Sequence, residues 1–173
     1  FNGTLRYEFD PFANRGLLTI AMMNTSAPAN GGYITGFLFN VPGADQLATA
    51  TLQSASFPFQ QTFGNGLNAQ PFGIYDAGAA LGGMFQGGGS PNNGIGVGQT
   101  GEFVFAIEAI DANAFNAADF IVGSTGQDLA VRFRGFENGG SDKVIATIIP
   151  APGALAVMGL AFIAGRGRRR RMR

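Results

Sequence analysis

Residues 102–110 read EFVFAIEAI, and this stretch decides the fold class of the chain. Phe103, Phe105 and Ile107 alternate with residues on the other side of an extended backbone. Successive side chains of a β-strand point to opposite faces of a sheet, so a repeat of two predicts a strand with one buried face. A helix would instead space its apolar residues three or four positions apart. The stretch therefore predicts a strand that contributes aromatic side chains to a core.

The same alternation recurs along most of the chain. In residues 129–136, LAVRFRGF, the side chains of Leu129, Val131 and Phe133 share one face, and an alanine and two arginines take the other. Short alternating runs bounded by Gly, Asn, Pro and Asp are typical of strands joined by turns. Further strands are predicted at Thr4–Phe9, Leu17–Asn24, Tyr33–Asn40, on both sides of Pro58 within residues 47–63, and at Lys143–Ile149.

Three segments interrupt the alternation. Residues 64–101 are rich in glycine, and we expect a long loop there with at most one short helix near Asp76–Leu81. Residues 112–120, ANAFNAADF, predict another short helix with Asp111 as its N-cap. The sequence NGGS at Asn138–Ser141 predicts a hairpin turn.

The number of strands and the density of turns indicate an all-β fold. We predict an antiparallel β-sandwich, jelly-roll-like, over residues 1–149, followed by a C-terminal hydrophobic helix. The chain holds 17 phenylalanines and no cysteine. Since burial contributes about 25 cal/mol per Å² of apolar surface, the phenylalanines can support a stable core without disulfide bonds.

Charge divides the chain into two parts. Residues 1–149 carry five Lys or Arg and eleven Asp or Glu side chains, a net charge of −6. Such an acidic body argues against nucleic acid as a partner, because neutralising phosphates needs clustered cations. The chain also lacks histidine and cysteine, which excludes Ser–His and Cys–His catalysis and thiolate zinc sites.

Residues 150–173 form the second part. Pro150, Ala151 and Pro152 interrupt regular structure, and an uncharged apolar run follows over residues 154–165. The apolar stretch from residue 148 to residue 165 would be about 27 Å long as a helix, slightly short of the roughly 30 Å hydrocarbon core of a membrane. We therefore expect a helix that enters the membrane in transit rather than a permanent anchor. Six arginines close the chain: Arg166, Arg168, Arg169, Arg170, Arg171 and Arg173.

This tail resembles the PEP-CTERM sorting signal of bacterial exosortase substrates, in which a Pro-Glu-Pro-like motif precedes a short hydrophobic helix and an arginine-rich end. Here Pro150-Ala151-Pro152 occupies the place of the motif, with Ala151 in place of the family's Glu. The segments "ITGFLFNVP" after residue 33 and "AVRFRGFENGGSDKV" after residue 129 are also similar to PEP-CTERM surface domains. No Leu-Pro-x-Thr-Gly string, the signal for a sortase, is present.

The resemblance implies an exported bacterial protein that is not an enzyme. An exosortase in the inner membrane would recognise Pro150 and Pro152 and cleave near Ala151–Gly153, while the terminal arginines hold the tail on the cytoplasmic side. The domain would then reach the cell surface or extracellular matrix, with a structural or adhesive role among extracellular polysaccharide. We also expect a secretory signal peptide ahead of Phe1.

The alternative from the residues is a secreted module that binds glycan or calcium. Oxygen ligands for calcium gather in two clusters, although neither has the EF-hand spacing, and helix capping and turn formation explain both equally well. The first cluster comprises Asp111, Asn113, Asn116 and Asp119, and the second Glu137, Asn138, Ser141 and Asp142. The chain has no Trp, and Tyr7, Tyr33 and Tyr75 are spread out, which argues against an ordinary aromatic platform for sugars.

Two further kinds of chemistry are weighed and set aside. Glu102 and Glu108 share a predicted strand but lie about 20 Å apart, too far for a pair of glycosidase carboxylates. A hydrolase would need carboxylates brought together from different strands. The glycines of residues 94–101 lead into a strand rather than a helix, and no lysine is near, so a phosphate-binding loop is not expected.

Overall fold

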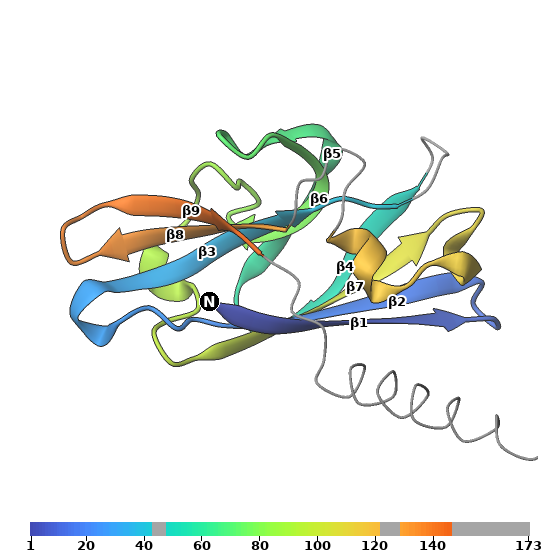
Figure 1. Cartoon of the computed structure of the whole chain (residues 1–173), viewed down its shortest axis with the longest axis horizontal. Coiled ribbons are helices and arrows are strands. Elements are labelled where there is room, and N and C mark those ends of the chain that lie inside the picture. The colour runs from blue at the N-terminus through green and yellow to red at the C-terminus, as the bar shows by residue number, and fades with distance from the viewer. Residues whose placement is uncertain (43–47, 122–128, 147–173) are drawn as a thin grey trace, which may run out of the picture.

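The computed structural model describes residues 1–42, 48–121 and 129–146, which form two antiparallel β-sheets packed face to face (Figure 1). The first sheet has the order β1 (Asn2–Asp10), β2 (Arg15–Met23), β7 (Thr100–Glu108), β4 (Thr49–Ala55). The second has the order β5 (Phe59–Asn68), β6 (Ile74–Leu81), β3 (Gly31–Phe39), β8 (Ala130–Phe136), β9 (Ser141–Ile145). Short 3₁₀ helices lie at η1 (Pro28–Asn30), η2 (Pro91–Asn93), η3 (Ala112–Ala114) and η4 (Ala117–Phe120). The predicted all-β sandwich is confirmed.

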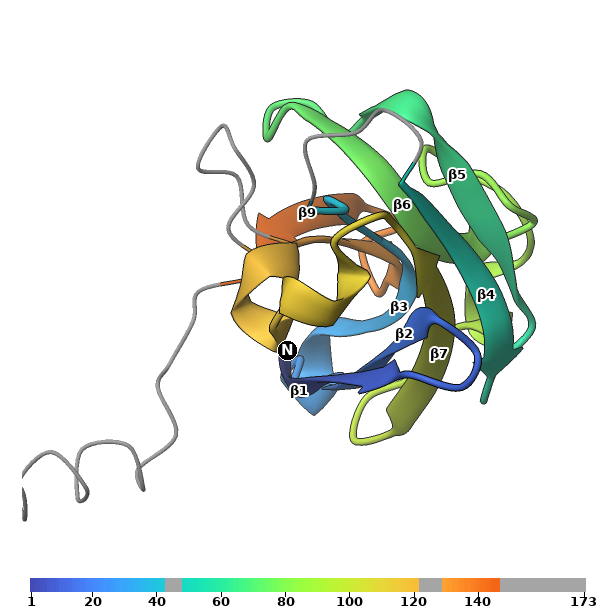
Figure 2. The same cartoon turned by 90° about the vertical axis from the view of Figure 1, so that its right-hand side faces the viewer.

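The connections between the described strands are of two kinds. Hairpins join β1 to β2, β5 to β6, and β8 to β9 within one sheet. The remaining connections cross from one sheet to the other, so residues far apart in the sequence become neighbours. Leu18 on β2, for example, lies opposite Phe105 on β7. Figure 2 shows the two sheets end-on, with β4 and β5 adjacent at one side of the sandwich.

Phenylalanine rings from both sheets fill the space between them. Phe37 of β3 contacts Phe103 of β7 edge-to-face, with ring centroids 4.7 Å apart. Phe39 and Phe105 make a similar pair at 5.0 Å. All four side chains are fully buried, as the alternation in residues 102–110 predicted for Phe103 and Phe105. Edge-to-face pairs add stability beyond the area that they bury.

The side of the sandwich between β4 and β5 is closed by one side chain. Gln61 of β5 accepts a hydrogen bond from the Leu52 amide at 2.9 Å and donates to the Ala50 carbonyl at 3.1 Å, both on β4. Its amide therefore pairs with β4 as another strand would.

On the side of the sandwich next to β1, the turns of η3 and η4 pack against the β1 side chains. The Tyr7 hydroxyl of β1 donates to the Ala112 carbonyl at 2.6 Å, and its ring lies 5.1 Å from that of Phe120.

The expected long loop over residues 64–101 is wrong in its first part. β5 continues to Asn68, and residues 74–81, expected to include a helix, form the central strand β6. Alanine favours helices, but here it provides small side chains that pack beneath the rings of the facing sheet. A Cβ atom at Gly78 would lie 2.0 Å from the Phe37 carbonyl oxygen, so β6 and β3 can pair only with glycine there. Packing in the sheet overrides local propensity.

The helix predicted over residues 112–120 is also corrected. Two short 3₁₀ turns, η3 and η4, replace it, and Asp111 makes no side-chain capping bond. The residue that caps is Asn116, whose side chain accepts from the Ala118 amide while Asp119 accepts from the Asn116 amide. This reciprocal capping box stops one helix from running through the segment.

The remaining strand predictions agree with the structure, except that β9 ends at Ile145. The proposed domain boundary at residues 149–150 and the C-terminal helix lie outside the described residues. Within the described residues, no helix is long and apolar enough to cross a membrane.

Candidate functional site

The sorting residues predicted from the sequence lie outside the described part of the chain. These are Pro150, Ala151 and Pro152, together with Arg166, Arg168, Arg169, Arg170, Arg171 and Arg173.

The sandwich carries a cationic patch, formed by Arg132, Arg134 and Lys143, on the outer face of its second sheet. The alternation of β8 directs Val131 and Phe133 into the core, which leaves the two arginines on the opposite face. Lys143 of β9 is the register partner of Arg132. Three of the five cations in residues 1–149 are thus gathered on adjacent strands.

The arginines of the patch hold a glycine-rich segment, residues 82–89, here called the outer loop. Arg132 donates from Nη1 to the Phe85 carbonyl at 3.2 Å and to Gln86 Oε1 at 3.1 Å. Arg134 donates from Nη1 to the Gly88 carbonyl at 2.7 Å. Glycine lets the outer loop lie against the end of β6, because a Cβ atom at Gly88 would lie 2.4 Å from the Leu81 carbonyl oxygen.

Lys143, on the neighbouring strand β9, completes the patch on the same face of the sheet. Its Nζ donates to the Gln70 carbonyl at 2.7 Å, in the turn between β5 and β6. The three cations therefore bind backbone carbonyls rather than carboxylates. Among the described residues, an ion pair joins Arg6 and Glu8, in the other sheet.

Burial and mutual repulsion both act on the charges of the patch. Burial lowers the pKa of Arg132, and the neighbouring Arg134 lowers it further. The pKa of Lys143 is lowered by burial and then by Arg132. Carbonyl dipoles offset part of this repulsion, but no carboxylate of the described residues forms an ion pair with the patch. The patch can thus attract an anion from solution.

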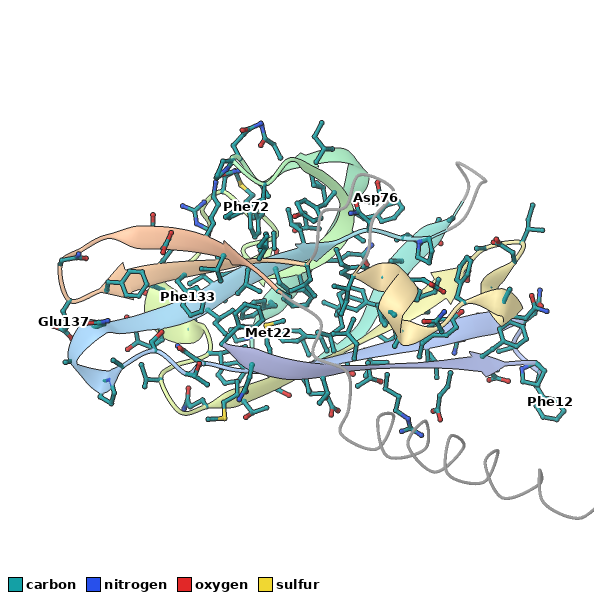
Figure 3. The ribbon with its side chains drawn as sticks, viewed as in Figure 1. Phe12, Met22, Phe72, Asp76, Phe133 and Glu137 are labelled. Carbon is teal, nitrogen blue, oxygen red and sulfur yellow. The ribbon has the colours of Figure 1, made fainter. Side chains whose placement is uncertain are left out.

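A small second core lies beneath the outer loop. Its buried members, Leu38, Ala69, Tyr75, Phe85 and Ala130, come from the sheet and from both covering loops. Phe72 packs against this cluster from the β5–β6 turn and is labelled in Figure 3. The outer face of the second sheet is therefore partly covered, which the sequence did not reveal because the covering segments are mostly glycine and polar residues.

Buried Asn24 organises the glycines of residues 94–101. Its Nδ2 donates to the carbonyls of Gly32 at 3.0 Å and Ile95 at 2.9 Å. Its main-chain amide donates to the Gln99 carbonyl. The segment thus runs along β3 into β7, as the predicted lead-in to a strand. Sequence reasoning missed Asn24, whose signal was a polar residue at the end of an apolar strand.

The oxygen-rich clusters considered for calcium are used in local turns. Asp119 and Asn116 cap η4. Asn138 Oδ1 accepts from the Gly140 amide and Asp142 Oδ1 from the Lys143 amide. No group of three or more Asp or Glu side chains suited to a metal ion occurs within the described ranges. The structure therefore places Asn116, Asp119 and Asn138 in capping and turn roles.

The remaining candidates are separated in space. Glu102 and Glu108 lie on β7, opposite Ala21 of β2 and Thr49 of β4 respectively, so the strand holds them apart. Of the tyrosines, Tyr75 is fully buried and Tyr7 is half-buried against η4. The strand thus keeps Glu102 and Glu108 apart, and the described residues offer no row of exposed tyrosines.

One end of the sandwich presents exposed apolar side chains. Phe12, at the tip of the β1–β2 hairpin, is 99% exposed and projects from that end in Figure 3. Ile110, just after β7, is 85% exposed. Both follow strand ends that meet in the sheet, because Gly16 pairs with Ile107. Isolated exposed side chains of this kind are common on protein surfaces.

Comparison with known proteins identifies no family. No family model matches the chain, and no curated protein matches it. A solved structure described as "The unique CBM3- of Hungateiclostridium clariflavum" is 12% identical and aligns over 86% of this chain and 100% of that chain, with a TM-score of 0.35. A TM-score this low does not establish a shared fold, so the fold is assigned from the sheets described above.

Proposed function

We propose that this protein is an exported bacterial surface or matrix component, in which a non-catalytic β-sandwich is delivered by a PEP-CTERM-like tail. The observation that carries the proposal is the division between the two parts. The phenylalanine core is assembled from described residues, and the last strand ends at Ile145, shortly before Pro150. The sequence of residues 150–173, with its Pro-Ala-Pro motif, apolar run and six arginines, then supplies the sorting signal.

Each part of the tail has a physical role in this proposal. Pro150 and Pro152 mark the site that an exosortase recognises. The apolar run over residues 154–165 enters the inner membrane during export. The six arginines resist translocation and hold the end of the chain in the cytoplasm. After processing, the sandwich acts at the cell surface or in the matrix, in a structural or adhesive role.

The chemistry of the sandwich supports a role without catalysis. The chain has no histidine or cysteine, and the described carboxylates do not cluster. Proteins that act by display and adhesion need a stable scaffold and exposed surfaces rather than a reactive group.

Expression in a host that contains an exosortase tests the sorting. Mass spectrometry of the surface fraction should find chains that end near Ala151–Gly153. A Pro150→Ala, Pro152→Ala variant should accumulate unprocessed in the membrane fraction. Pro58→Ala, at an exposed bend between β4 and β5, is the matched control and should be processed normally. Surface-exposed protein that still ends at Arg173 would contradict the proposal.

The cationic patch favours one additional function, binding of an acidic extracellular polysaccharide. Electrophoresis through gels containing polygalacturonate tests it, in a background where the six tail arginines are replaced by Gln because they would bind any polyanion. The chain should be retarded, and Lys143→Gln should reduce the retardation while Arg6→Gln should not. Equal retardation by neutral dextran, or no effect of Lys143→Gln, would refute this function.

A further inference from the structure

Three of the four edge strands of the described sheets are short or lie against another edge strand. At one side β4 and β5 meet, and Gln61 occupies the outward amide of Leu52 and carbonyl of Ala50. The register of β4 also shifts between Leu52 and Ser54. β9 has five residues, and the carboxylate of Asp142 accepts from the Lys143 amide on the same strand. Short length, irregular register and charged residues are common ways to prevent an edge from pairing.

β1 has neither the short length nor the irregular register, and its charged residues Arg6 and Glu8 are opposite in sign. It extends over nine residues, contains no proline, and pairs with β2 in continuous register from Asn2 to Asp10. Its main chain hydrogen-bonds to β2, and no described residue hydrogen-bonds to its outward amides and carbonyls. Unpaired backbone groups along a long regular edge form a template for another strand. In Figure 2, β1 lies at the border of its sheet, with the turns of η3 and η4 nearby.

The side chains of β1 are complementary to themselves when the strand is reversed. In an antiparallel pair centred on Tyr7, Arg6 lies opposite Glu8 of the second copy, and Glu8 opposite Arg6. On the other face, Leu5 meets Phe9, and Tyr7 meets its own equivalent. Opposite charges and apolar or aromatic residues directly across from each other are the pairs that stabilise a sheet.

The adjacent registers of the same parity lack this complementarity. Centring the pair on Arg6 sets the two arginines against each other, and centring it on Glu8 does the same for the two glutamates. Like charges directly opposite are destabilising. The sequence of β1 thus selects one register.

From this edge and its self-complementarity we infer that β1 binds β1 of a second copy of this chain, in the register centred on Tyr7. The contact is a two-fold, self-complementary interface. It joins the two first sheets into one continuous sheet, and Arg6 and Glu8, which pair with each other within one chain, exchange partners across the axis. The inference goes beyond the proposed sorting and does not depend on it.

Charge exchange tests the interface in the full chain, purified in detergent micelles because of its apolar tail. Sedimentation equilibrium over a concentration series should show a dimer. Arg6→Glu alone, or Glu8→Arg alone, introduces like charges at two contacts and should raise the dissociation constant about tenfold or more. The double variant, which keeps the composition and net charge, should dimerise like the unmodified chain.

Mixing the two single variants gives the sharpest result. One copy then carries two glutamates and the other two arginines, so heterodimers should form with the affinity of the unmodified chain. A monomeric unmodified chain would overturn the inference, as would single variants that dimerise normally or fail to recover on mixing. Association through the tail would be insensitive to these charges. The single variants would then dimerise normally, which would overturn the inference.

A cross-link tests the register independently, since the chain has no native cysteine. Tyr7→Cys places two thiols on the two-fold axis, where paired Cα atoms are about 4.5–5.5 Å apart, within the range for a disulfide. Thr4→Cys is the matched control, because its two copies would lie about 20 Å apart. Mild oxidation should yield a covalent dimer for the first variant only. Equal yields would overturn the register.

Discussion

The two faces of the second sheet are covered by different physical means. Its inner face packs phenylalanines against those of the first sheet, in a core without charge. Its outer face carries a small apolar cluster, and over it the cationic patch holds glycine-rich loops by their carbonyls. The inner layer is stabilised by buried area and the outer layer largely by directed hydrogen bonds. The inner face should therefore dominate stability, and the outer face should control local order.

The largest effect is expected in the inner core. Phe37→Ala removes a fully buried ring that contacts Phe59, Phe103 and Phe105. It should lower the free energy of unfolding by about 3–5 kcal/mol, through lost burial and the cavity left behind. Urea denaturation measures this loss. Phe12→Ala, which removes a ring that is 99% exposed, is the control and should change stability little. Equal losses for both would contradict the assignment of the core.

The outer cluster should be less sensitive. Phe85→Ala removes a ring that is 5% exposed and packs in the smaller cluster. We expect a loss of about 2 kcal/mol, because fewer neighbours surround the ring and the outer loop can close over the space. The same urea titration compares it with Phe37→Ala. A loss as large as that of Phe37→Ala would show that the two faces contribute equally to stability.

Removal of the arginine clamp, the hydrogen bonds from Arg132 and Arg134 to the outer loop, should act locally. The double variant Arg132→Gln, Arg134→Gln deletes the hydrogen bonds to the outer loop and should cost about 1–2 kcal/mol. Hydrogen exchange should accelerate in residues 82–89 more than in β3. Arg6→Gln, whose charge lies in an exposed ion pair, is the control and should cost little. Uniform acceleration across both sheets would mean that the clamp serves the whole fold.

The smallest effect concerns the first sheet. Burial, with the charge of Asp111, raises the pKa of Tyr7 above its ordinary value of 10.0. Above pH 10 the unfolded chain releases this proton more readily than the folded one, so stability should fall as pH rises further. Tyr7→Phe should lose about 1 kcal/mol at neutral pH, with the hydrogen bond to Ala112, and should flatten this decline. A decline of the same steepness in Tyr7→Phe would contradict the assignment.

The inner layer could be predicted from the sequence, because the alternation along a strand indicates which side chains face the core. Phe103, Phe105 and Ile107 lie on one face of β7 by geometry alone, and the structure buries all three. The opposite placement of Arg132 and Arg134 follows from the same rule. The hairpin at residues 138–141 also carried its own turn residues.

The outer layer could not be predicted from the sequence. Its hydrogen bonds join residues that are distant in sequence, and they use main-chain carbonyls, which every residue has. A carbonyl of Gly88 gives no sign in the sequence that Arg134 will bind it. β6 was hidden for a related reason, since its alanines and Gly78 are selected by space beside β3 rather than by strand propensity. Capping by Asn116 instead of Asp111 depended on where the chain turns into η4.

The position of Asn24 has a consequence for how quickly the native state is reached. Its amide joins the end of β2 to the carbonyls of Gly32 and Ile95, so the bonds can form only after segments 71 residues apart have met. Domains dominated by such distant pairings have high contact order and refold over milliseconds to seconds rather than microseconds. We expect this junction to consolidate late, after the local hairpins, which would make the meeting of β2, β3 and β7 the slow step of folding.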